Sequence, residues 1–368
     1  MISLFKYVSK YGDLSFNEEE FNEVDNVILS LLSYIDFKGI VSNTSKKISL
    51  KEASEIYFSK YTKKELDQNI FSIKSAIKLF DYIKDFKRYQ ELKLYNYSYE
   101  KSINKQFSAM CIKITDDLVY VSYEGTDELI SGWKEDFDLS YMFPIPSQVD
   151  AVNYLNKSIK LRDKKVIVGG HSKGGNLALV SAMYCNFWIR RKIIKIYSND
   201  GPGLLEEELN SYSFKKIKSR YVHIIPDKSI VGIMLENCND LVIKASKGGI
   251  LAHDALNWEV LDNSFIYTEL NESSKKLNKI MKDWLDEYSF EQRMVCVEEL
   301  FSIFSNNNIN SLIDIKKSGV FGIIKLIRES KNLGNTASEM FKQLISLIYD
   351  DYSSMIKDKI SFNKDKDF

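Results

Sequence analysis

The chain has 368 residues, of which 44% are hydrophobic and 28% are charged, the balance of an ordinary folded protein. Its length suits one large α/β domain of about 250 residues together with a smaller appendage. The 51 lysine and arginine residues equal the 51 aspartate and glutamate residues, so no overall basic charge attracts nucleic acid or an anionic membrane. Peripheral contact with a membrane would therefore need a local patch.

The sequence also gives no sign of a metal site, a disulfide framework or a membrane anchor. Its four cysteines lie far apart and form neither a CxxC pair nor a metal pattern with histidine: Cys111, Cys185, Cys238 and Cys296. Lys6 and Lys10 interrupt the apolar residues at the N-terminus, and no later run approaches the roughly 20 apolar residues of a membrane span. We expect a cytoplasmic protein with reduced thiols and no integral membrane span.

The first 90 residues predict amphipathic helices. Ser15 and Glu18 form a capping pattern, and apolar residues recur at helical spacing from there to Phe37. A second capping pattern begins at Ser49, and the stretch FSIKSAIKLFDYIKDF from Phe71 is a third helical candidate. We interpret these helices as packing elements.

From residue 91 the apolar residues alternate with a period of two, which predicts strands. ELKLYNYSY, SAMCIKIT and LVYVSY form an antiparallel entry to a sheet. Further along, the strands KVIVGG, IIKIYS, YVHII and LVIKAS alternate with helical segments, one of them from Lys173 to about Arg190. This alternation predicts an α/β fold, with a mostly parallel sheet flanked by helices.

Residues beyond Asn263 show only helical periodicity, and Ser289 with Gln292 predicts a capping box there. We therefore divide the chain into residues 1–263, an α/β domain that includes the N-terminal helices, and residues 264–368, a helical appendage. The terminal NKDKDF is expected to fray.

The motif G-x-S-x-G occurs as Gly170-His171-Ser172-Lys173-Gly174, between a β-branched strand and a predicted helix. In such an elbow the serine backbone is strained and its neighbours must be small, which accounts for the glycines. The turn lifts the serine hydroxyl above the sheet and sets the amide of Lys173 beside it, at the start of a helix. We predict that Ser172 is a nucleophile and that the fold is of the α/β-hydrolase type.

A serine nucleophile needs a general base, and α/β-hydrolases carry serine, acid and histidine in that order along the chain. Two of the three histidines lie within the elbow and within a strand, which leaves His253 in a loop after the last strand. The acid should follow a strand between Ser172 and His253. Asp227, which follows YVHII, is our choice, and Asp200 of SNDGPG is the alternative.

An oxyanion hole needs a second backbone N–H from the loop after an earlier strand. The segment YEGTDELISGW fits, because Gly125 permits close approach of the backbone and Thr126 offers both an amide and a hydroxyl. We therefore expect the amides of Thr126 and Lys173 to hold the oxyanion.

Five runs carry a resemblance to a known family: YEGTDELISGWKEDF, GGHSKGGNLAL, SNDGPG, IIPDKSIVG and HDALNW. Together they resemble the Mbeg1-like family of bacterial α/β-hydrolases, relatives of the class 3 lipases, over roughly residues 17–260. The resemblance implies Ser172 as nucleophile, Asp227 and His253 as its partners, and Thr126 at the oxyanion hole. It does not supply a substrate.

The leading hypothesis is a serine hydrolase that cleaves carboxylic esters, including lipid esters, through an acyl-enzyme and without a metal or an organic cofactor. Its partner would be a small-molecule or lipid ester, and not nucleic acid. Two alternatives stay open. A thioesterase or a peptidase could use the same triad, and a catalytically silent fold could act as a binding or regulatory module.

Overall fold

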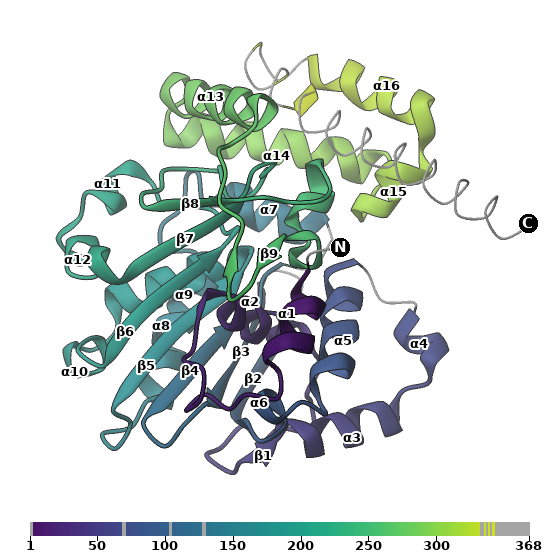
Figure 1. Cartoon of the computed structure of the whole chain (residues 1–368). Helices are drawn as coiled ribbons and strands as arrows, with labels where there is room; N and C mark the ends of the chain where they lie inside the picture. The colour runs from purple at the N-terminus through teal and green to yellow at the C-terminus, as the bar shows by residue number, and fades with distance from the viewer. Residues whose placement is uncertain are drawn as a thin grey trace, which may run out of the picture.

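A computed structural model describes residues 3–331 apart from 68–70, 103–104 and 127–129, together with residues 335, 338, 341 and 342 (Figure 1). The terminal NKDKDF, which we expected to fray, lies outside the described residues, as does much of the predicted appendage after residue 331.

One sheet of eight strands forms the centre of the molecule, and its strands lie side by side in sequence order. The strands are β1 (Ile48–Ser49), β2 (Lys93–Ser102), β3 (Lys105–Lys113), β4 (Leu118–Tyr123), β5 (Lys165–His171), β6 (Ile193–Asn199), β7 (Tyr221–Pro226) and β8 (Asp240–Ile243). Strands β1 to β4 pair antiparallel, whereas β4 to β8 are parallel. The predicted α/β fold with an antiparallel entry to a mostly parallel sheet is confirmed.

The order of the strands decides which helices cover which face of the sheet. Right-handed crossovers that all step in one direction place their helices on one face. Accordingly α8 (Pro146–Ser158) and α9 (Lys173–Tyr184) share one apolar cluster with the sheet. The N-terminal helices fill a second cluster with side chains from the sheet. They are α1 (Leu4–Tyr11), α2 (Glu23–Leu31), α3 (Leu50–Lys60) and α5 (Phe71–Ile83). The N-terminal region therefore completes the core of the hydrolase fold.

Helix α2 begins later than the sequence predicts. Its N-cap is Asn22, which forms a reciprocal capping box with Asp25. Ser15 Oγ does donate to Glu18 Oε2 (2.7 Å), but this pair closes only a turn. The physical reason is the side chain of Arg88, which binds the carbonyl oxygens of this segment.

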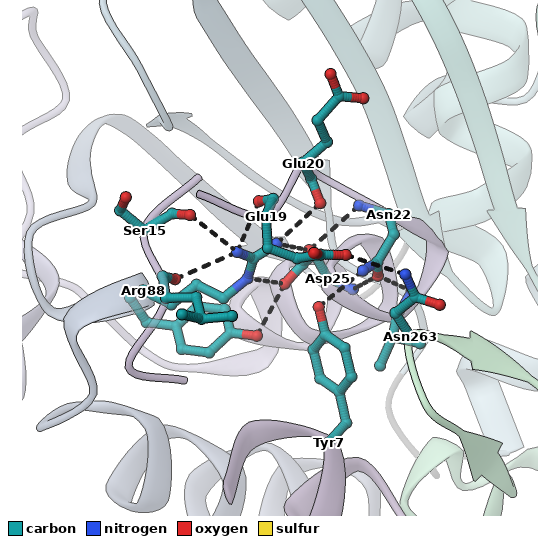
Figure 2. A network of polar contacts seen from close by, with 11 residues as sticks. Tyr7, Ser15, Glu19, Glu20, Asn22, Asp25, Arg88 and Asn263 are labelled. Carbon is teal, nitrogen blue, oxygen red and sulfur yellow. Dashed lines mark hydrogen bonds and ion pairs between the residues drawn. The ribbon is translucent and has the colours of Figure 1, made fainter. Parts of the chain in front are cut away.

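Arg88 belongs to the short helix α6 (Lys87–Gln90), and its guanidinium binds backbone carbonyl oxygens of residues 14–20 that helical amides would otherwise bind (Figure 2). Its guanidinium donates to the carbonyl oxygens of Glu19 (2.9 Å) and Glu20 (3.1 Å) and to both oxygens of Asp25 (2.9 and 2.5 Å). The hydroxyl of Tyr89 also donates to Asp25 Oδ1 (2.8 Å). Because carbonyls held by a guanidinium do not need helical amides, this segment stays irregular until the cap of α2.

Within residues 264–331 the structure describes four helices after the sheet: α13 (Glu272–Glu287), α14 (Phe290–Asn306), α15 (Leu312–Lys317) and α16 (Gly319–Ser330). They lie beyond the carboxyl ends of β7 and β8, at the top of Figure 1. The predicted Ser289–Gln292 capping box is present. These helices share one apolar cluster with α7 (Ile130–Asp138) and with the loop after β7. No helix among the described residues is long and apolar enough to cross a bilayer.

The other α-helices and strands of the described chain are short. They are α4 (Lys63–Asp67), α10 (Phe187–Arg190), α11 (Glu206–Leu209), α12 (Tyr212–Lys215) and the hairpin of β9 (Val260–Leu261) with β10 (Ser264–Phe265). Two of them, α10 and α12, precede β6 and β7 and lie at the amino-terminal ends of those strands.

Candidate active site

The serine of the G-x-S-x-G motif sits in a strained turn between β5 and α9. Ser172 has φ 58° and ψ −138°, a conformation that is costly for a residue with a Cβ. A Cβ on Gly170 would lie 2.3 Å from the carbonyl carbon of Gly174, and one on Gly174 would lie 2.2 Å from the carbonyl oxygen of Tyr123. Neither position can therefore hold a larger residue without a backbone shift. Ser172 itself is only 4% exposed.

The loop after β4 lies directly against this turn. A Cβ on Gly125 would lie 2.4 Å from the carbonyl oxygen of His171 and 2.8 Å from Ser172 Cβ, so only a glycine lets the loop approach the elbow this closely. The next residue, Thr126, is buried, and its Oγ1 has no hydrogen-bond partner among the described residues. Lys173 is the first residue of α9, so its amide lies outside the helical hydrogen-bond ladder. The two residues predicted to hold an oxyanion therefore both adjoin Ser172.

Asp200, and not Asp227, contacts the candidate base. His253 Nδ1 lies 2.6 Å from Asp200 Oδ2. Asp227 instead accepts a hydrogen bond from the amide of Ala245 (3.1 Å). The prediction that Asp227 orients His253 is wrong, and the alternative, Asp200, has the expected geometry. The reason is the order of the sheet: Asp200 follows β6, the neighbour of the elbow strand β5, whereas Asp227 follows β7, one strand farther away.

Asp200 is fully buried and held on both oxygens. Its Oδ1 accepts from Ser229 Oγ (2.5 Å) and from the amide of Gly232 (3.0 Å). Burial alone would raise the pKa of Asp200, but the hydrogen bond and charge of His253 and the bond from Ser229 outweigh it and lower the pKa. An ionised Asp200 keeps the proton of His253 on Nδ1 and leaves Nε2 free to accept a proton.

The elbow histidine supports the His253 loop. His171 Nε2 donates to the carbonyl oxygen of His253 (2.7 Å), and its ring lies 4.5 Å from the ring of His253, centroid to centroid. Tyr34, which follows α2, lies 2.9 Å from His171 through its hydroxyl and Nδ1. Burial, helped by the charge of His253, lowers the pKa of His171 to about 3, so this imidazole is neutral. An N-terminal residue is thus joined to the candidate base through the elbow.

The third histidine is engaged elsewhere. His223 of β7 has one ring nitrogen 2.7 Å from Asp240 and the other 3.0 Å from the carbonyl oxygen of Gly201. Asp254, although adjacent to His253, caps the amide of Leu256 (3.1 Å). Among the histidines of the chain, only His253 therefore combines a carboxylate partner with a position beside the elbow.

Two acidic residues of α7 also reach the site, and sequence reasoning missed both. Glu135 forms an ion pair with the buried ammonium of Lys173. Asp136 is buried beside Thr126 and Lys173, and within the described chain its Oδ1 has no hydrogen-bond partner. Burial raises the pKa of Asp136 to about 7, although the charge of Lys173 opposes the shift. The signal was the polar cluster KED within GWKEDF, which a helix places next to the elbow.

Comparisons with known proteins bear on the whole of this region. A model of the Mbeg1-like family matches residues 83–302, a range that contains Ser172, Asp200 and His253 but not α1 to α3. Among solved structures, the crystal structure of M37 lipase is similar, with 16% sequence identity and a TM-score of 0.35 over 58% of this chain and 70% of that chain. A comparison with curated proteins gave no match.

Proposed function

Because the chain belongs to the Mbeg1-like family and has a fold of the α/β-hydrolase type, we propose that it is a serine hydrolase acting on carboxylic esters. The observation that carries the proposal is the position of a strained serine elbow beside a pair formed by the partly buried His253 and the buried Asp200, at the carboxyl edge of one sheet. A structural turn has no need of a backbone strained at a serine, nor of a buried pair beside it.

The proposed reaction uses three side chains and two amides. His253 Nε2 takes the proton of Ser172 as the oxygen attacks the ester carbonyl, and the ionised Asp200 stabilises the imidazolium that forms. The amides of Thr126 and Lys173 donate to the oxyanion. The alcohol leaves with the proton from His253, and water then attacks the acyl-enzyme with His253 again as the base.

An apolar acyl group is favoured by the surroundings of the site. The cluster shared by α7, α13 and α14 includes Ile130, four residues after Thr126, and Ile250, three residues before His253. The cluster thus reaches the site through the start of α7 and through the 3₁₀ turn Gly249–His253. An ester with an apolar acyl chain fits such surroundings better than a charged substrate.

The test is a panel of esters, thioesters and peptides offered to the purified full chain. We expect turnover of esters that rises with acyl length from acetate to medium chains and is abolished in Ser172→Ala. Ser289→Ala, which removes a serine from the cap of α14, serves as the matched control and should keep full turnover. Cleavage confined to thioesters or peptides would reassign the leaving group, and a folded chain that turns over none of these substrates would favour the binding-module alternative.

A further inference from the structure

Three loops at the edge of the sheet opposite Ser172 are strongly basic. They precede β5, β6 and β7, and because these strands are parallel the loops lie at one edge. Their sequences are KLRDKK (residues 160–165), RRKIIK (190–195) and KKIKSR (215–220). Each run carries four lysine or arginine residues, and the only acidic residue among them is Asp163. We call this surface the basic edge. Asp117 of the neighbouring β3–β4 turn pairs with Lys164 (2.8 Å), and the other cationic side chains of the three runs give this edge an excess of positive charge.

Hydrogen bonds join the three loops into one surface. Lys192 Nζ donates to the carbonyl oxygens of Lys160 (2.7 Å) and Leu161 (2.9 Å). Arg220 donates to the carbonyl oxygens of Arg190 (2.6 Å) and Ile193 (2.7 Å). In Figure 1, α10 lies at the end of β6 that is remote from helices α13 to α16. The basic edge is therefore continuous and separate from the candidate active site.

Large apolar side chains project from the same loops into water. They are Leu161 (91% exposed), Phe187 (57%), Trp188 (67%) and Tyr212 (73%). By contrast Trp258 is fully buried and Trp284 is 3% exposed, so exposure is not a general property of the tryptophans in this chain. Ile189 anchors α10 in the core, and this holds Trp188 and its neighbour outward on a short rigid helix.

A small basic cavity adjoins the basic edge. It has a volume of about 100 Å³ and is lined by four cationic side chains, Lys47, Lys113, Lys160 and Arg162, and by the polar residues Ser45, Ser158, Asp116 and Asp163 among others. Asp116 pairs with Lys113 (2.8 Å), and Asp163 accepts from the amide of Lys160 (2.7 Å). The remaining cationic side chains leave the cavity with an excess of positive charge.

We propose that the basic edge docks on a membrane surface that contains anionic phospholipids. Lysine and arginine side chains near such a surface are attracted to acidic headgroups, and tryptophan and tyrosine rings prefer the interface between headgroups and acyl chains. The four exposed apolar side chains would be stabilised by contact with the apolar region of a bilayer. Nucleic acid has no comparable apolar phase to receive an aliphatic side chain such as Leu161. The cavity beside Arg162 accepts a headgroup phosphate.

The docked orientation has a consequence for the enzyme. The edge and Ser172 lie at opposite ends of β5, which at about 3.3 Å per residue spans about 20 Å. The candidate active site therefore faces away from the bilayer. Docking holds the protein at the membrane but does not bring acyl chains of the bilayer to Ser172. The inference consequently stands or falls independently of the proposed hydrolase activity.

The experiment is co-sedimentation of the full chain with vesicles of phosphatidylcholine, with and without about a quarter of phosphatidylglycerol, at about 0.05 M and about 0.5 M salt. We expect binding to the anionic vesicles at low salt, at least tenfold weaker binding at high salt, and little binding to the neutral vesicles. Tryptophan emission should shift to shorter wavelength on binding. The shift should be lost in Trp188→Phe, because Trp258 and Trp284 are already buried and the partly buried Trp133 belongs to α7, which packs on the C-terminal helices away from the basic edge.

Paired variants separate this surface from general charge effects. Arg191→Glu with Lys216→Glu should weaken vesicle binding at least tenfold, as should Phe187→Ala with Trp188→Ala. The controls are Lys276→Glu with Lys279→Glu and, separately, Phe290→Ala, which make like changes at exposed residues of α13 and α14. All of these variants should react with a fluorophosphonate at the wild-type rate.

Three results would overturn the inference. They are equal binding to neutral and anionic vesicles, wild-type vesicle binding by the Arg191→Glu and Lys216→Glu double variant, and binding of single-stranded or duplex nucleic acid without any binding of vesicles.

Discussion

Two buried carboxylates illustrate opposite uses of polar groups in this fold. Asp25 lies under the N-terminal segment, where both of its oxygens accept hydrogen bonds from Arg88 and one accepts from Tyr89 (Figure 2). Asp136 lies beside Thr126, and among the described residues neither Asp136 Oδ1 nor Thr126 Oγ1 has a hydrogen-bond partner. The Thr126 side chain lowers the pKa of Asp136 only slightly against burial, so these two groups stabilise each other less than Arg88 and Tyr89 stabilise Asp25.

The largest effect should come from the carboxylate that holds the candidate base. Asp200→Asn should lower ester turnover by about 10⁴ while the fold persists, because an imidazole in the wrong tautomer and an unstabilised imidazolium both hinder proton transfer. Asp227→Asn is the matched control and should change turnover by less than about threefold, since Asp227 binds only a backbone amide. Turnover and thermal midpoint measured for both variants decide between the two strands. A larger loss of turnover in Asp227→Asn would restore the prediction made from sequence.

Substitutions in the Arg88–Asp25 pair should change the stability of the protein and leave catalysis unchanged. Arg88→Met leaves Asp25 buried without its partner, which should lower the free energy of unfolding by about 3–5 kcal/mol. The double variant Arg88→Met with Asp25→Leu should recover much of that loss, because it also removes the unpaired charge. Denaturant unfolding measures both changes. A loss below about 1 kcal/mol in the single variant would show that the Arg88–Asp25 pair contributes little to the stability of the fold.

Substitution of Asp136 should raise the stability of the protein instead of lowering it, and the gain should depend on pH. The pKa of Asp136 is raised to about 7 from an ordinary value of 3.8, so the folded protein binds this proton more tightly than the unfolded chain. Its ionisation therefore lowers stability as pH rises from about 4 to 7, and the cost is constant above that range. Asp136→Asn should stabilise the protein by about 4 kcal/mol at pH 8 and by little at pH 4. Equal effects at the two pH values would contradict the shifted pKa.

The smallest effects should come from removing one tyrosine hydroxyl beside the elbow and one in the N-terminal polar cluster. Tyr34→Phe removes the hydroxyl beside His171, and Tyr7→Phe removes the hydroxyl that accepts from Asn22 (2.8 Å). Each loss should cost about 1 kcal/mol of stability. Only Tyr34→Phe should also lower kcat, by about fivefold with KM unchanged, because His171 supports the loop of the candidate base. Equal kcat values for both variants would reduce the Tyr34–His171 contact to packing.

Local patterns predicted much of this structure. The strands and α9 follow from the period of the apolar residues, and the elbow follows from its glycines. What the sequence could not decide depends on neighbours that are distant along the chain. The choice between Asp200 and Asp227 turns on which strand lies beside β5, and both residues leave a strand end in the same way. The contact of Tyr34 with His171 joins residues 137 positions apart. Pairings of that kind are set by how α2 packs on the sheet.

Labelling with a fluorophosphonate is the sharpest test of whether Ser172 is a nucleophile activated by His253. We expect one label per folded chain, found on the peptide that contains Ser172, with wild-type labelling in His223→Gln and strongly slowed labelling in His253→Gln. A label that survives Ser172→Ala, a folded wild-type chain that takes no label, or a rate lowered by His223→Gln and not by His253→Gln would contradict it.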